Sequence, residues 1–271
     1  MLGSAVVLAT PTREEFIQEI DLVTTRVTAI LESASELAPR VRGEDWSVGD
    51  AASHLAVTQE VFANLLAGGP NPYAGHDPST YGAVNAGLLE AAGHRDTPGL
   101  VTAIRRGSDA VIAAAAADPA GEFESPLGPM PLIPLLAYCL AHLLQHGHSI
   151  AVALGRPSPL EAPHVRLALP FVAQATPFAY RMRSRPGIDA RVEMRITGEN
   201  RFEIHFTPDA ATVVPPSGQR IDCHLVCGPE AFLLILLGQA DPLQMLLRRR
   251  AFAWGRRPWL GLQLKEYLPG L

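Results

Sequence analysis

The first half of the chain carries apolar residues at the three- and four-residue spacing of an α-helix. In its first segment these residues are Phe16, Ile20, Val23, Val27, Ile30 and Leu31. Thr12 and Glu15 form a capping box, a pair three residues apart that predicts where this helix begins. Ser47 and Asp50 repeat the arrangement before a second helix, which we expect to stop at the Gly-Gly-Pro sequence of residues 68–70.

Two more helical regions follow after loops rich in glycine and proline. One spans residues 81–117 and is interrupted by GHRDTPG at 93–99, so either one broken helix or two helices are expected. The other, residues 134–154, reads PLLAYCLAHLLQHGHSIAVAL and is apolar almost all round. That pattern predicts a helix through the middle of a helical domain. Four such helices predict a four-helix bundle, a fold that builds metal sites from facing helices.

The pattern changes at a Pro- and Gly-rich segment, residues 155–163, the kind of exposed linker where domains separate. Charge changes at the same place: the chain has 8 basic and 17 acidic residues through Leu160, and 14 basic and 10 acidic residues beyond it. We therefore expect two domains, residues 1–157 and 163–271. Because the net charge is −5 and no basic motif is interleaved with aromatic residues, no nucleic-acid partner is expected.

The second domain is expected to combine helices with strands. Residues 189–196 and 201–206 alternate between polar and apolar positions around a turn at 197–200, which predicts a β-hairpin. The other expected elements are a helix at 165–182 that contains Pro170 and Pro177, a strand at 219–226, helices at 228–237 and 241–248, a short segment at 252–255 and a final helix at 258–268. Each proline should kink or end the helix that contains it. This order predicts an α+β domain with a mainly antiparallel sheet.

The composition is typical of a two-domain protein from a reducing compartment. A chain of 271 residues that is 48% hydrophobic can bury two cores. Three cysteines are too few, and odd in number, for a disulfide framework. The first ten residues lack the basic region of a signal peptide, and no uninterrupted apolar run reaches the roughly 18 residues of a membrane span. We therefore expect a cytoplasmic protein with no membrane partner.

Candidate chemistry lies in the most apolar helix, where His142 and His146 are one turn apart and project from the same face. His148 lies about 200° round the helix from His146 and is not expected to join them. His54, two turns into the second helix and among apolar neighbours, is the candidate third ligand. Three neutral imidazoles would leave a zinc ion one open position, as in a catalytic site. A histidine pair on an apolar face is also compatible with simple burial.

Two stretches carry a resemblance to known proteins: DWSVGDAASHLA, from residue 45, and HLLQHGHSIAVALG, from residue 142. They resemble the metal-binding bundle of the DinB-like superfamily, and more closely that of the mycothiol-dependent maleylpyruvate isomerase family. In this resemblance His54 and His146 stand at the family's two histidine positions, whereas His142 replaces a glutamate and Ser149 an acidic residue. A three-histidine set is what many other DinB-like thiol transferases use. The order of elements in the second half resembles the sterol-carrier-protein-like domain that the family carries at its C-terminus.

The resemblance implies a divalent metal and a thiol cosubstrate. Zinc is the first expectation among zinc, nickel and iron, all of which imidazole suits. The thiol would be mycothiol or a similar low-molecular-weight thiol, and the substrate a small molecule. One lysine against 21 arginines indicates a GC-rich genome, which is compatible with a mycothiol-using actinobacterium. Asn85 is expected to line the cavity, because family members often place an asparagine there, and Arg105 is either a surface residue or a partner for a carboxylate of the ligand.

Two functions of different classes remain open. The first is an enzyme in which a metal-activated thiol isomerises, or is transferred to, a small unsaturated or electrophilic substrate. The alternative is a non-catalytic or repurposed carrier that binds a hydrophobic small molecule through the C-terminal domain. No catalytic side chain is assigned beyond the three candidate ligands. Cys139, Cys223 and Cys227 are interpreted as buried structural residues.

Overall fold

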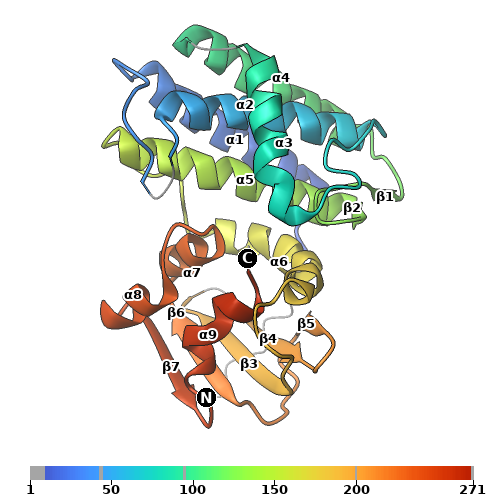
Figure 1. The fold of residues 1–271 in the computed structure, drawn as a ribbon, viewed down its shortest axis with the longest axis vertical. Coiled ribbons are helices and arrows are strands. Elements are labelled where there is room, and N and C mark those ends of the chain that lie inside the picture. Colours follow the sequence, from blue (N-terminus) through green and yellow to red (C-terminus); the bar gives the residue numbers. More distant parts are fainter. Residues whose placement is uncertain (1–9, 43–44, 94–95, 199, 270–271) are drawn as a thin grey trace. The chain divides into compact units, whose positions relative to one another are not determined.

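The structure is a computed structural model that describes residues 10–42, 45–93, 96–198 and 200–269 (Figure 1). They fall into two compact units, one of Thr12–Pro159 and the other chiefly of Leu160–Leu271. The sequence predicts no signal peptide in residues 1–10. Of that stretch, only residue 10 lies within the described residues. The domain limits expected from the sequence, 1–157 and 163–271, remain our proposal for where the chain is separable.

The first unit is a helical bundle. Its helices are α1 (Arg13–Glu32), α2 (Val48–Leu66), α3 (Tyr81–Ala92), α4 (Thr97–Ala116) and α5 (Leu132–Ala153), with a 3-10 turn η1 (Pro78–Thr80) and a small sheet of β1 (Glu122–Phe123) and β2 (Met130–Pro131). Helix α1 packs on α4 and α5, and α2 packs on the same two helices, which closes a ring of four. Figure 1 shows α3 running across α2, which it contacts. The predicted four-helix bundle is therefore present, with α3 as an additional helix.

Local sequence explains where these helices begin. Both predicted capping boxes form: Thr12 accepts from the backbone N–H of Glu15, and Ser47 accepts from that of Asp50. The interrupted region of residues 81–117 is two helices, and the Asp96 side chain caps the second of them. Helix α5 begins two residues earlier than the sequence indicated, because a proline is tolerated in the first turn of a helix.

Two glycines allow the helices of the bundle to approach closely. A Cβ added at Gly107 of α4 would lie 2.7 Å from Gln59 Cβ on α2. One added at Gly147 of α5 would lie 2.5 Å from Val27 Cγ2 on α1. Both distances are well inside the roughly 3.5–4.0 Å at which carbon atoms attract one another. The glycine that follows His146 therefore has a packing role, since it lets α5 lie against α1.

The second unit is an α+β domain. Its strands are β3 (Ala190–Ile196), β4 (Arg201–Phe206), β5 (Ala211–Val214), β6 (Cys223–Cys227) and β7 (Ala251–Gly255), and its helices are α6 (His164–Arg181), α7 (Pro229–Leu236), α8 (Pro242–Leu247) and α9 (Leu260–Tyr267). The sheet has the order β5-β4-β3-β6-β7. Strands β3 and β6 are parallel, and the other three pairings are antiparallel. The sheet is thus mixed, although mainly antiparallel as the sequence predicted.

The two sides of this sheet differ in polarity. Alternate strand residues such as Val192 and Ile204 are buried in an apolar core with side chains of α6, α7 and α9. On the other side, Glu193 is fully buried and accepts hydrogen bonds from Arg195 and Arg201. His224 of β6 lies with Nδ1 2.6 Å from the same carboxylate. Burial alone would raise the pKa of Glu193, but these hydrogen bonds and the charges of the two arginines leave it below its ordinary value.

Several elements of the second unit differ from the sequence prediction. Helix α6 is continuous through Pro170 and Pro177. Strand β5 was not predicted, because it is only four residues long and stands between prolines. The strand expected at 219–226 begins at Cys223. The predicted turn of the β3–β4 hairpin contains residue 199, which lies outside the described residues.

None of the helices in the described ranges is long and apolar enough to cross a membrane, and this includes the apolar helix α5.

Candidate metal centre

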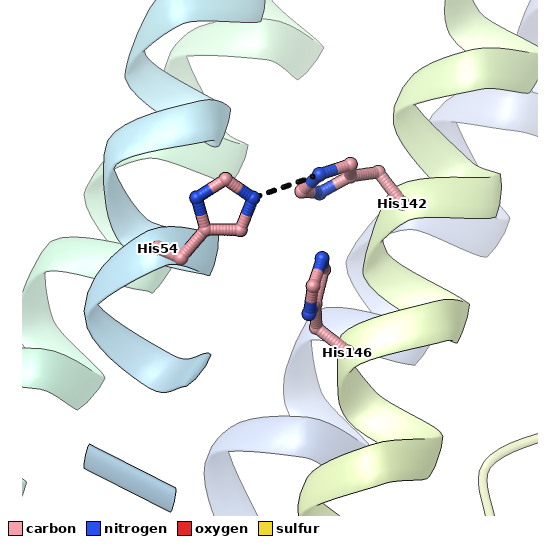
Figure 2. A group of neighbouring side chains, drawn as sticks. All are labelled: His54, His142 and His146. Atoms are coloured by element: carbon pink, nitrogen blue, oxygen red, sulfur yellow. Dashed lines mark hydrogen bonds between the residues drawn. The ribbon is translucent and has the colours of Figure 1, made fainter. Parts of the chain in front are cut away.

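The structure brings together the three histidines that the sequence predicts as metal ligands. His54 projects from α2, and His142 and His146 project from successive turns of α5, which packs on α2. Figure 2 shows the three rings facing one another across the space between the two helices. The Nε2 atoms of His54 and His142 are 3.3 Å apart. One nitrogen of each ring lies within 4.8 Å of the corresponding nitrogens of the other two.

This spacing fits a tetrahedral metal ion. With Zn–N bonds of about 2.0–2.1 Å, two ligand nitrogens on a tetrahedral zinc ion would lie about 3.3–3.4 Å apart. The His54–His142 distance matches that value, whereas His146 must move closer to complete the set. The cluster contains no carboxylate or thiol, so a divalent ion held there would keep its full positive charge. The residues present therefore suit zinc or a similar ion with one position left open.

Burial keeps all three imidazoles neutral at pH 7. It lowers the pKa of His54 to about 4. Burial is the main cause that lowers the pKa of His146 to about 3, and the neighbouring charge of His54 is the second. The pKa of His142 is lowered well below 6.5 by burial and then by the other two rings. Because only the neutral imidazole binds a metal, the ligands are in the competent protonation state before any ion arrives.

Thr58 determines which nitrogen of His142 carries the proton. Its hydroxyl donates to the carbonyl of His54 at 2.9 Å, so its oxygen is free to accept. That oxygen lies 3.3 Å from Nδ1 of His142, and we therefore assign the proton of this ring to Nδ1. Nε2 of His142 then faces the centre with its lone pair, as a metal ligand must. The sequence analysis missed Thr58, although its place one turn after His54 on the same helix face was a usable signal.

Trp46 covers the other end of the cluster. Its ring stacks on His146, with centroids 6.0 Å apart, and lies tilted against His54 at 4.8 Å. Nδ1 of His146 is buried and has no hydrogen-bond partner among the described residues. His146 is thus oriented by packing rather than by a hydrogen bond to its second nitrogen. The aromatic residue just before the Ser47 cap therefore belongs to the site, a role that the sequence analysis did not assign.

A pocket of about 80 Å³ opens beside the cluster within the first unit. Its lining consists of aromatic, aliphatic and uncharged polar residues together with two of the histidines: His54, Thr58, Val61, Phe62, Tyr73, Tyr81, Asn85, Pro126, Tyr138 and His142. Tyr73 donates a hydrogen bond to Oδ1 of Asn85 at 2.6 Å. A small molecule in this pocket would lie next to the face of the cluster that His54 and His142 form. The tyrosines, which come from a loop and from helices α3 and α5, were not predicted.

The remaining candidates from the sequence lie in different places. Asn85 lines the pocket, as expected. Arg105 is not among the lining residues; it is partly exposed on α4 and lies 3.9 Å from Glu32. His148 is outside the cluster, with Nδ1 2.8 Å from the Ser158 hydroxyl. Cys139 is buried, donates to the Gln59 side chain at 3.2 Å, and has its pKa raised by burial to about 12.

Comparison with known proteins relates the helical bundle to a known family and the whole fold to solved structures. Residues 20–141 match the family model described as the mycothiol maleylpyruvate isomerase N-terminal domain. Among solved structures, the chain is similar to a histidine-to-alanine mutant of the mycothiol-dependent maleylpyruvate isomerase, with 12% identity, a TM-score of 0.58, and coverage of 92% of this chain and 95% of that chain. A second crystal structure with that enzyme's name has 13% identity, a TM-score of 0.55, and coverage of 87% and 92%. No curated protein matches the chain.

The structural similarity extends over both units and, at these identities, shows the fold alone. The family match lies within the helical bundle and includes His54 but ends one residue before His142. The three-histidine arrangement is therefore an observation on this chain.

Proposed function

The first domain belongs to the mycothiol maleylpyruvate isomerase N-terminal domain family, and from this premise we propose that the protein is a metal-dependent, thiol-using enzyme. It would bind a divalent ion, zinc first among the candidates, through His54, His142 and His146. A mycothiol-like thiol would be its cosubstrate. The substrate would be a small unsaturated or electrophilic molecule that is either isomerised or joined to the thiol.

The observation that carries this proposal is the set of three neutral, buried imidazoles with two Nε2 atoms 3.3 Å apart. When bound, the metal would lower the pKa of a coordinated thiol, so that the thiol binds as thiolate at neutral pH. The chain's own residues do the rest. Thr58 holds the tautomer of His142, and Trp46 covers the side of the cluster where His146 lies. A second reactant in the pocket beside His54 and His142 would lie next to the thiol sulfur.

In an isomerisation, the thiolate sulfur would add to one carbon of a conjugated double bond. The electron pair of that bond moves onto the adjacent carbonyl, and the remaining single bond rotates. Elimination of the thiolate restores the double bond in the other geometry, so that the thiol is recovered unchanged. If the adduct is protonated instead, the thiol stays on the substrate and the reaction is an S-transfer.

The metal assignment can be tested by elemental analysis of the purified full-length protein. We expect about one divalent ion per chain, lost when His54, His142 or His146 is replaced by alanine. His148→Ala is the matched control on the same helix and should keep the metal. Full metal occupancy in the His142→Ala protein would contradict the assignment.

The thiol assignment can be tested by titrating mycothiol into the metal-loaded protein in buffers of different ionisation enthalpy. Binding as thiolate should release about one proton and should strengthen as pH rises toward the thiol's own pKa of about 8.5. His142→Glu, which restores the family's glutamate, should weaken thiolate binding because it removes one unit of positive charge from the site. Thiol binding that releases no proton, or that survives removal of the metal, would favour the hydrophobic-carrier alternative.

A further inference from the structure

Helix α3 forms part of the wall of the pocket beside the candidate metal centre. The pocket is lined on one side by α2 and α5, which carry the three histidines, and otherwise by α3 and irregular segments, through Tyr73, Tyr81, Asn85 and Pro126. We propose that α3 is a gate that opens and closes access to the centre. The inference rests on the proposed function, since it concerns entry to that same site, and it adds a moving element that the metal assignment does not require.

Helix α3 is anchored much less firmly than the helices that carry the histidines. All twelve of its positions are described and none is buried, whereas most residues of α2 and of α5 are. Gly82 and Gly87 lie inside α3, where glycine weakens a helix. A Cβ added at either position would meet no atom within 4 Å, so packing does not require these glycines. A helix with so few buried contacts should open locally more readily than the rest of the bundle.

The contacts that hold α3 in place lie on the wall of the pocket itself. Tyr81, at the start of α3, donates from its hydroxyl to the carbonyl of Pro126 at 2.6 Å. Tyr73 donates to Oδ1 of Asn85, also at 2.6 Å, and its ring meets that of Tyr81 with centroids 5.0 Å apart. A hydrogen bond of this kind shifts an equilibrium by roughly two- to twelvefold. Two such bonds favour the closed position of α3, and breaking them separates the residues that form the wall.

Such a gate would set rates without setting affinity. The candidate ligands come from α2 and α5, so α3 contributes none of them. Opening of α3 would therefore speed entry and exit equally and leave the equilibrium constant unchanged. In the closed position it would keep bulk water from the reactants, and in the open position it would admit and release them.

Access can be measured on the metal-free, full-length protein with diethyl pyrocarbonate, which modifies neutral imidazoles. Mass spectrometry gives the rate of modification at His54 and His142, and the exposed His76 is the internal reference. Tyr73→Phe/Tyr81→Phe keeps both rings but removes both hydroxyl groups. In this variant the modification of His54 and His142 should become at least about fivefold faster relative to His76, because the closed position has lost two hydrogen bonds.

The opposite change should have the opposite effect. Gly82→Ala/Gly87→Ala strengthens α3 without a clash, so modification of the two buried-site histidines should become at least about fivefold slower. Thr102→Ala raises helix propensity at an exposed position of α4, which is not represented in the described lining, and is the matched control. It should leave the rates within about twofold of the parent. Unchanged rates in both double variants, or equal changes at His76, would overturn the proposal.

Zinc exchange separates this inference from the proposed function. Stopped-flow transfer of zinc to and from a chromophoric chelator gives both rate constants. In Tyr73→Phe/Tyr81→Phe both should rise at least about fivefold, with the dissociation constant within about twofold of the parent. If zinc binds but neither its rates nor histidine modification responds, the gate is wrong and the proposed function stands. If modification responds as expected but no zinc binds, the gate stands and the proposed metal centre is wrong. A changed dissociation constant with unchanged modification rates would show that the tyrosines act on the centre directly, and would refute the gate.

Discussion

Burial of three neutral histidines should make the metal-free bundle sensitive to mild acid. In the unfolded chain each imidazole regains a pKa near 6.5, whereas in the folded protein the pKa of His54 is about 4 and that of His146 about 3. Between these values the unfolded state binds protons that the folded state does not. The stability contributed by neutral burial is therefore complete above pH 6.5 and is lost as pH falls toward the folded pKa values.

The size of the effect follows from proton linkage. At pH 5.5 His54 and His146 each lower the free energy of unfolding by about 1.3 kcal/mol relative to pH 7.5, or by roughly 2.6 kcal/mol together, and the lowered pKa of His142 acts in the same direction. Domains are typically stable by only about 5–15 kcal/mol, so the loss is a large fraction of the total. Zinc at about a hundred times its dissociation constant should restore about 2.7 kcal/mol at a given pH, because it binds only the folded protein.

Trp46 offers a local probe for this measurement. It contacts His54 and His146, whereas the other two tryptophans, Trp254 and Trp259, are exposed residues of the second unit. In a Trp254→Phe/Trp259→Phe background, urea unfolding monitored by fluorescence would report on the bundle alone. The titration would be run with a chelator at pH 7.5 and at pH 5.5, and the difference between the two free energies of unfolding would be compared among variants.

His146→Leu should reduce that difference by about 1.3 kcal/mol, whatever it does to stability at either single pH. His76→Ala, which removes an exposed histidine away from the cluster, is the control and should leave the difference unchanged. The same loss between pH 7.5 and pH 5.5 in His146→Leu as in the parent would refute the reasoning, because it would place the acid sensitivity elsewhere in the chain.

Three further substitutions test other parts of the structure. Thr58→Val should weaken metal binding by roughly ten- to a hundredfold, measured by competition with a chromophoric chelator, and an unchanged affinity would remove Thr58 from the site. Gly147→Ala should lower the free energy of unfolding by about 1–3 kcal/mol, because the added methyl group clashes with Val27. Adding Val27→Ala should recover part of that loss. If the effects of the two changes are simply additive, the two residues do not interact. Glu193→Gln should destabilise the second unit by roughly 1–3 kcal/mol in chemical denaturation, because it weakens the charge-assisted hydrogen bonds that this buried carboxylate accepts; a loss under about 0.5 kcal/mol would contradict this account.

The helical half could be predicted well because its signals are local. The spacing of His142 and His146 places them on one face of any α-helix, and the capping box at Ser47 sets the position of His54 within its own helix. Whether the two helices face each other is a matter of tertiary packing. The reasons to expect it before the structure are indirect, namely the apolar surroundings of each histidine and the family resemblance.

The pocket could not be predicted in the same way. Tyr73 and Pro126 lie in irregular segments, which have no periodicity to show which way a side chain points. The pairing of Tyr73 with Asn85 depends on how the loop before α3 returns to the bundle. In the second unit, the parallel pairing of β3 with β6 is likewise a tertiary choice that strand patterns leave open. Strand β5 is too short for alternation to be recognised.

The charge balance of the site connects the metal, the thiol and the proposed substrate. A divalent ion held by His54, His142 and His146 would carry two positive charges with no carboxylate in the cluster to offset them. In a low-dielectric setting such an excess attracts an anion strongly, and a thiolate that takes the open position would reduce it to one. The ion would thus select the thiol by its charge, and one positive charge would remain beside the pocket that His54 and His142 help to line.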